Sequence, residues 1–217
     1  MDISYKILKP ETKVVVFDLD GTLYNKKGMV RRMMFSALFE WRMMLRERKT
    51  RKQFRGVWTG DKESFYHQYF ETMAAGCLST ADYAQWWYNT RYMPLMVRVL
   101  KKYYKPVDWV IPFVSQCRQL GIRLVVLSDY GHTKEKLQAL GLECPLFDWV
   151  VSAPELGGLK PASQLLVCVA AEMGVQPHQC LVIGDRDDTD GELARSVNRS
   201  EERRVGKECR SRWSPYH

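Results

Sequence analysis

The sequence predicts an α/β fold, in which a Rossmann-like parallel sheet has helices on both faces and carries an inserted α-helical cap. Three observations support this prediction. Apolar strand-like runs alternate with helical patterns, the first run ends in two closely spaced carboxylates, and a long helical stretch interrupts the alternation. Strands that alternate with helices favour parallel pairing, because each helix returns the chain to the same end of the sheet. The 217 residues can form one buried core plus an insertion.

The predicted elements follow one another in order along the chain. Strand signals are short apolar runs, each followed by a turn or helix signal, and they lie at about 13–18, 122–128, 147–152 and 180–184. Helices are expected near 112–120, 133–140, 161–173 and 190–197. Gly121, Gly141 and Gly174 follow the first three helices as left-handed terminating residues would. Pro161 is expected in the first turn of the third helix.

The first strand ends in the most informative motif, Asp18-Leu19-Asp20-Gly21-Thr22. Side chains two residues apart on a strand lie on the same side, so Asp18 and Asp20 can converge. Ligands in open α/β sheets bind at the carboxyl ends of the strands. Two neighbouring carboxylates repel each other, so such a pair usually holds a cation or a shared proton. The alternative is an ordinary acidic turn after a strand.

Three later segments also carry polar residues where a strand ends or a helix starts. The apolar run before Ser128 and Asp129 resembles the first one, and Lys160 precedes Pro161. A third segment, Gly184-Asp185 through Asp190, has the form G-D-x-x-x-x-D. Each of these segments alone is weak, but their order along one chain is specific.

Together, the four segments resemble the four signatures of the haloacid dehalogenase (HAD) superfamily, whose members are mostly magnesium-dependent phosphatases. The resemblance covers about residues 12–198 and implies a HAD-like hydrolase with a helical cap of the first type. Dehalogenases of this superfamily lack an aspartate two residues after the nucleophile, so Asp20 implies phosphate chemistry. The expected function is Mg²⁺-dependent hydrolysis of a small phosphorylated metabolite. A phosphomutase that uses the same four signatures is the alternative within enzymes.

The resemblance implies a role for each matching residue. Asp18 is expected to be the nucleophile, and Asp20 the general acid and base. Ser128 and Lys160 are expected to stabilise the charge that develops on the phosphoryl oxygens. Thr22, Ser128, Asp129 and Lys160 form the expected phosphate-binding set.

The same resemblance implies a magnesium site. Its expected ligands are the carboxylates of Asp18 and Asp185 and the carbonyl oxygen of Asp20, with Asp190 orienting Lys160 or the metal's waters. None of the four signature segments contains His or Cys, which argues against zinc. Asp187 and Asp188 are expected in a solvated loop.

Residues 25–108 are predicted to form the cap, and 1–24 with 109–198 the core. Helical periodicity appears in Val30, Met34, Ala37/Leu38, Trp41 and Met44/Leu45. Trp86, Trp87, Tyr88, Tyr103 and Tyr104 are expected in the cap interior. Residues 26–55 contain eleven Lys or Arg and two Glu. A solvated basic face is the favoured interpretation, with attraction of a phosphorylated anion as the alternative. A third possibility is a binding protein whose basic cap recruits an anionic polymer such as nucleic acid.

The last segment, 199–217, changes abruptly to an Arg- and Ser-rich composition and resembles a translated sequencing-adaptor tail. We expect this tail to be non-native, and the natural chain to continue after Val197 with a short apolar strand; a genuine basic tail is the alternative. The six cysteines show no metal-binding spacing and are expected to be reduced thiols. No signal peptide or membrane span is apparent, so a cytoplasmic enzyme without nucleic-acid or membrane partners is expected.

Overall fold

A parallel sheet of four strands forms the centre of the molecule. The computed structural model describes residues 7–36, 40–76 and 79–197. The strands are β1 (Val14–Phe17), β2 (Arg123–Ser128), β3 (Trp149–Ser152) and β4 (Cys180–Ile183). Their order in the sheet is β3-β2-β1-β4, and every neighbouring pair is parallel. This confirms the predicted α/β class.

Strand β1 lies in the interior of the sheet and sets its register. Val15 is paired with Leu124 of β2 on one side and Leu181 of β4 on the other. All four residues of β1 are buried. A strand that is covered on both faces needs an apolar residue at every position, which explains the uninterrupted run of Val and Phe in the sequence.

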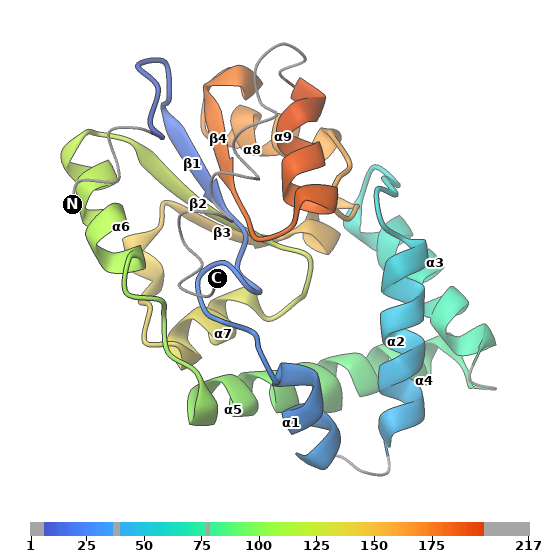
Figure 1. The fold of residues 1–217 in the computed structure, drawn as a ribbon. Coiled ribbons are helices and arrows are strands. Elements are labelled where there is room, and N and C mark those ends of the chain that lie inside the picture. The colour runs from blue at the N-terminus through green and yellow to red at the C-terminus, as the bar shows by residue number, and fades with distance from the viewer. Residues whose placement is uncertain (1–6, 37–39, 77–78, 198–217) are drawn as a thin grey trace.

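Helices cover both sides of the sheet, with α6 on one side and α8 and α9 on the other (Figure 1). They are α6 (Val110–Gln119), α7 (Thr133–Ala139), α8 (Gln164–Glu172) and α9 (Glu192–Val197). Gly121, Gly141 and Gly174 have positive φ angles just after α6, α7 and α8, as predicted. The expected position of Pro161 is wrong: the Lys160–Pro161 peptide is cis, and α8 begins only at Gln164.

An aromatic cluster joins β1 to the helices and loops on one face of the sheet. The ring of Phe17 contacts Trp109, Phe113 and Phe147, with centroids 6.0–6.5 Å apart, and its side chain is fully buried. Replacing a buried Phe by Ala removes apolar contacts and leaves a cavity. We expect Phe17→Ala to lower the free energy of unfolding by about 3–5 kcal/mol.

Urea denaturation followed by circular dichroism measures this effect. Ile111→Ala is the matched control, because the Ile111 side chain lies on α6 and is 47% exposed. That control should change stability by less than about 0.5 kcal/mol. Equal effects of the two substitutions would contradict the assignment of Phe17 to the core.

In the described part of the chain, five α-helices and a short π-helix lie between β1 and α6 in the sequence. They are α1 (Met29–Ser36), α2 (Trp41–Gln53), α3 (Lys62–Ala75), α4 (Ala81–Trp87), the π-helix η3 (Tyr88–Tyr92) and α5 (Met93–Tyr103). They occupy the lower and right-hand parts of the view, beside the sheet domain (Figure 1). This agrees with a helical cap; the limits at 25 and 108 stay a prediction.

The apolar stripe inferred for the first cap helices is wrong at most of its described positions. Val30, Met34, Trp41 and Leu45 are 38–53% exposed. Met44, which also belongs to the inferred stripe, is buried, and Ala37 and Leu38 lie outside the described residues. The buried positions of α1 are Met29 and Met33 instead. In the described part of the chain, α1 ends at Ser36 and α2 begins at Trp41.

The cap has an aromatic interior, as predicted, but only some of the predicted aromatic residues are buried in it. Trp87 and Tyr88 are almost fully buried, whereas Trp86 and Tyr103 are about half exposed and Tyr104 is partly buried. The interior also contains contacts among rings of α3, η3 and the segment between α2 and α3. These rings belong to Phe54, Phe65, Tyr66, Tyr69, Phe70 and Tyr88.

The segment between α2 and α3 is hydrogen-bonded to the loop that carries Lys160. The N–H of Gly56 donates to the carbonyl of Lys160, and the N–H of Leu159 donates to the carbonyl of Val57. Gly157 has a φ of 91°, and a Cβ there would lie 2.6 Å from the backbone nitrogen of Asp61. Glycine therefore permits this close approach, and the cap is bonded directly to the loop before α8.

The predictions for the chain termini and cysteines are tested only in part. The expected strand after Val197 and the basic tail lie outside the described residues. Within the described part of the chain, Cys117, Cys168 and Cys180 are free thiols. No helix among the residues described is long and apolar enough to cross a membrane.

Candidate active site

The sequence motifs meet at the carboxyl ends of the central strands. Asp18 and Asp20 follow β1, Ser128 is the last residue of β2, and Asp185 lies two residues beyond β4. Because β2 and β4 flank β1 in parallel register, all of these residues reach the same edge of the sheet. The loop before α8 adds Lys160 to this group.

Asp18 is held by one neighbouring side chain on each carboxylate oxygen. Its Oδ2 accepts a hydrogen bond of 3.1 Å from the hydroxyl of Thr22, and its Oδ1 lies 2.6 Å from Nζ of Lys160. Its N–H donates to the carbonyl of Ile183 on β4. Thr22 therefore orients the carboxylate of Asp18 here; its phosphate contact stays a prediction.

Lys160 lies between two carboxylates. Its buried Nζ is 2.6 Å from Asp18 Oδ1 and 2.7 Å from Asp190 Oδ1. Burial would lower the pKa of Lys160, but the charges of Asp18 and Asp190 raise it well above its ordinary value. The contact predicted between Asp190 and Lys160 is thus present. Asp129 fixes the same loop, since its Oδ1 accepts the N–H of Lys160 at 3.0 Å.

Asp20 accepts three hydrogen bonds in a buried setting. Tyr24 donates to Oδ1 at 2.8 Å, Ser128 donates to Oδ2 at 2.9 Å, and Lys136 Nζ lies 2.5 Å from Oδ2. Burial by itself would raise the pKa of Asp20, but the charge of Lys136 and these hydrogen bonds lower it. The Asp20 carboxylate is therefore stabilised in its ionised form.

Lys136 is a site residue that the sequence analysis missed. It lies in the first turns of α7, its side chain is fully buried, and its Nζ also contacts the Ser128 hydroxyl at 3.2 Å. Burial lowers the pKa of Lys136, and the charge of Asp20 opposes this shift. In the sequence it stands in Thr133-Lys134-Glu135-Lys136, which is typical of a solvated helix. The only sequence signal that could have placed Lys136 near the site is its position, eight residues after Ser128.

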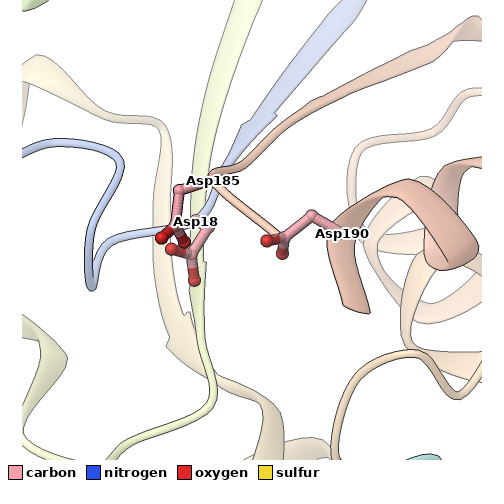
Figure 2. A group of neighbouring side chains, drawn as sticks. All are labelled: Asp18, Asp185 and Asp190. Carbon is pink, nitrogen blue, oxygen red and sulfur yellow. The ribbon is translucent and has the colours of Figure 1, made fainter. Parts of the chain in front are cut away.

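Three carboxylates form a candidate metal centre. Oxygen atoms of Asp18, Asp185 and Asp190 lie within 4.8 Å of one another, and their side chains point toward a common space (Figure 2). Burial and the neighbouring charge of Asp18 raise the pKa of Asp185, so a cation is favoured there. Oδ1 of Asp185 is buried without a hydrogen-bond partner among the described residues.

These oxygen donors fit a hard divalent cation such as Mg²⁺. The predicted ligand set differs in one member from the carboxylate group. Asp20 was expected to contribute its carbonyl oxygen, which here accepts a 2.9 Å hydrogen bond from Lys26. Asp190 belongs to the group but is also bound to Lys160, so its predicted place behind the metal ligands fits these contacts.

The cap contributes Arg51, which lies against the second motif. Its guanidinium stacks 3.9 Å above the ring of Tyr130 and donates to the carbonyl of Asp129. The buried Glu47 accepts from its Nε at 2.8 Å. The sequence placed Arg51 in a basic segment without distinguishing it from its neighbours.

Other basic residues of 26–55 also have partners in the fold. Arg46 donates to the carbonyl oxygens of Thr72 and Met73 at the end of α3. Arg55 pairs with Asp188 at 2.7 Å, and Asp188 is half exposed, as is Asp187. Asp187 and Asp188 thus lie in a solvated turn, as expected, and Asp188 also contacts the cap. The basic segment is therefore not only a solvated face, because some of its arginines have specific partners in the fold.

A cavity of about 590 Å³ lies next to the site, between the cap and the core. Its lining includes Tyr66, Tyr88, Gly131, His132 and Ser152. The hydroxyl of Tyr88 accepts the N–H of Gly131 at 3.2 Å, so this cavity borders the loop after Ser128. Asp18 is not among its lining residues, and we assign no phosphate site to it.

The chain belongs to the haloacid dehalogenase-like hydrolase family, which it matches over residues 12–198. This range contains every motif residue described above. A glyceraldehyde 3-phosphate phosphatase from Methanocaldococcus jannaschii is 26% identical over 190 residues, which are 85% of this chain and 81% of that enzyme. The enzyme of the same name from Methanopyrus kandleri is 35% identical over 100 residues.

The coverage of the curated relatives is uneven. The match to the Methanopyrus kandleri enzyme spans 41% of that enzyme, and a match to a chloroplast protein of Arabidopsis thaliana spans 9% of it. Among solved structures, a magnesium-bound HAD hydrolase from Bacillus subtilis superposes with a TM-score of 0.58 at 14% identity. The superposition covers 86% of each chain. At this identity the likeness concerns the fold.

Proposed function

We propose that this protein is a Mg²⁺-dependent phosphatase that hydrolyses the phosphate monoester of a small metabolite through an aspartyl-phosphate on Asp18. One observation carries the proposal. The Asp18 carboxylate is held at the end of β1, with Lys160 2.6 Å away and the hydrogen-bonded Asp20 two residues further on. This arrangement combines a nucleophile, a positive charge and a second carboxylate in one buried site.

In the first step, a carboxylate oxygen of Asp18 attacks phosphorus, and the bond from phosphorus to the ester oxygen breaks. Protonated Asp20 gives its proton to the departing alkoxide, which leaves as an alcohol. Lys160 stabilises the negative charge that the three remaining phosphoryl oxygens carry during the transfer. Ser128 can donate a hydrogen bond to one of these oxygens after release from Asp20.

In the second step, ionised Asp20 accepts a proton from water as the water oxygen attacks phosphorus. The bond between phosphorus and Asp18 breaks, and inorganic phosphate and the free carboxylate are released. A bound Mg²⁺, held by Asp18, Asp185 and the Asp20 carbonyl, would neutralise charge on the phosphoryl group. The charge of Lys136 lowers the pKa of Asp20, which favours the ionised form needed for this second step.

The relatives and the chemistry of the site support a small phosphate monoester as the substrate. The relatives from Methanopyrus kandleri and Methanocaldococcus jannaschii carry the name glyceraldehyde 3-phosphate phosphatase, so a triose phosphate is the first substrate to test. The free thiols fit a reducing compartment such as the cytoplasm. Arg46, Arg51 and Arg55 of the basic segment are bonded within the fold, so these three side chains are not free to bind a nucleic acid.

Release of inorganic phosphate from an aryl phosphate and from glyceraldehyde 3-phosphate, with and without Mg²⁺, tests the proposal. We expect turnover that requires Mg²⁺ and a fall of at least about 10⁴-fold in Asp18→Asn, because the amide cannot act as the nucleophile. Asp187→Asn is the matched control, since this half-exposed carboxylate pairs with Arg195 on the surface. Its activity should stay within about twofold of the unmodified protein.

The same assay separates hydrolysis from phosphoryl return to substrate. A phosphatase releases phosphate in proportion to substrate consumed, whereas a phosphomutase yields an isomeric phosphate ester and little inorganic phosphate. Full activity in Asp18→Asn would contradict the covalent mechanism. Nucleic-acid binding that is tight, salt-sensitive and unchanged in Asp18→Asn would favour the binding-protein alternative.

A further inference from the structure

The side chain of Lys26 contacts two oxygens of the expected metal site. Its Nζ lies 2.9 Å from the carbonyl oxygen of Asp20 and 2.7 Å from Oδ2 of Asp185. Lys26 belongs to the loop that follows the first motif, six residues after Asp20. Two of the three expected Mg²⁺ ligands are therefore bound to a cation that the chain itself supplies.

The Lys26 ammonium is closely packed against the loop that contains Gly21. Gly21 has a φ of 114°, and a Cβ at that position would lie 2.6 Å from Asp185 Oδ2 and 2.7 Å from Lys26 Nζ. Glycine is therefore required for the loop to pass so near the carboxylate. On the other side, the charge of Asp18 raises the pKa of Asp185, while Lys26 opposes that shift. Lys26 thus reduces the repulsion between two neighbouring carboxylates.

We propose that Lys26 is a tethered cation that competes with Mg²⁺ for the Asp185 carboxylate and the Asp20 carbonyl. The inference rests on the magnesium site of the proposed function, but not on turnover. A divalent ion that uses these oxygens would lie within a few ångströms of the ammonium, and the two positive charges repel each other. Metal binding must therefore displace Lys26. Its side chain is 44% exposed, so a path to solvent exists.

Isothermal titration with Mg²⁺ alone, without a phosphate ester, measures this competition. We expect Lys26→Met to bind Mg²⁺ about tenfold or more tightly than the unmodified protein, because a competing positive charge is removed. Lys27→Met is the matched control. Lys27 is the adjacent lysine in the same loop, and it is exposed. This control should bind within about twofold of the unmodified protein, since exposed charges interact weakly.

Thermal unfolding gives a second readout with opposite expected signs. Without Mg²⁺, Lys26→Met should unfold at a lower temperature than the unmodified protein, because Asp185 loses its counter-charge beside Asp18. In saturating Mg²⁺ the variant should gain the larger increase in unfolding temperature. A matched decrease in both conditions would indicate a structural role only, and would overturn the competition.

The titration and the phosphatase assay can fail independently. Tighter Mg²⁺ binding by Lys26→Met supports the inference even if no phosphate ester is hydrolysed. Equal or weaker binding overturns it even if hydrolysis is rapid. No Mg²⁺ binding by either protein would also overturn it, and would remove magnesium from the proposed function.

Discussion

Lys136→Met is expected to reduce both stability and turnover strongly. The substitution leaves the buried Asp20 carboxylate without the ammonium that lies 2.5 Å from it. Breaking a buried ion pair by removing one partner costs about 3–5 kcal/mol of unfolding free energy. We expect kcat for an aryl phosphate to fall by about 10²–10⁴-fold, the range that acid–base catalysis supplies, because Asp20 loses its orientation and its ionised form. Urea unfolding and initial rates measure the two effects.

Two further variants test whether the pair itself is responsible. Lys134→Met, on the exposed side of α7, should change stability by less than about 0.5 kcal/mol. The double variant Asp20→Asn/Lys136→Met removes both charges, so it should be clearly more stable than the sum of the two single changes predicts. Strict additivity would show that Lys136 and Asp20 do not interact in solution.

The pH dependence of this stability difference has a definite sign. The pKa of Asp20 is lowered in the folded protein, so the stabilisation is present above its ordinary carboxyl pKa of 3.8 and is lost as the pH falls further. The difference between the unmodified protein and Lys136→Met should therefore be largest near neutral pH. The stability difference should become smaller as the pH falls below 3.8. A difference that is constant with pH would indicate lost packing alone.

Arg51→Met is expected to destabilise the protein by about 3–5 kcal/mol, because it leaves Glu47 buried without its counter-charge. Glu47 is fully buried; its Oε1 also accepts from Tyr69 at 3.0 Å, and its Oε2 has no partner in the described part of the chain. The same substitution removes the stacking on Tyr130 and the bond to the Asp129 carbonyl. Urea denaturation with circular dichroism measures the loss.

A surface ion pair between the cap and the core provides the control for Arg51. Arg55 pairs with the half-exposed Asp188, so Arg55→Met should cost less than about 1 kcal/mol. The double variant Glu47→Gln/Arg51→Met removes the unpaired charge and should recover part of the stability lost in Arg51→Met. If Arg51→Met and Arg55→Met had equal effects, Arg51 would not be the stronger cap contact.

Asp18, Asp20, Ser128 and Asp185 could be placed together from the sequence alone. Each follows or ends an apolar run short enough for a buried strand, and parallel strands bring their carboxyl ends to one edge. Asp190 and Lys160 were linked through the family resemblance, and the structure has their side chains 2.7 Å apart. Strand positions were predicted to within about two residues, because complete burial leaves an unbroken apolar signal.

The cap was harder to predict from the same sequence. Its helical class was clear, but the stripe through Val30, Met34, Trp41 and Leu45 is largely exposed. Periodicity shows that a helix has an apolar face, but which of two adjacent apolar residues is buried depends on how the helix packs against its neighbours. Met29 and Met33 lie one position before the residues chosen, a rotation of about 100° around the helix.

The sequence by itself thus determined the α/β class, the order of the four motifs and the edge of the sheet where they meet. The tertiary structure decided which lysine and arginine side chains contact the motif residues at that edge. Lys26, Arg51 and Lys136 lie in segments that look like solvated basic loops or helices, yet each contacts a motif residue or its backbone. The sequence pattern does not show which residue a long, flexible lysine or arginine side chain will contact. Its partner is set by where neighbouring helices and loops cross the sheet, which depends on contacts between residues far apart in the chain.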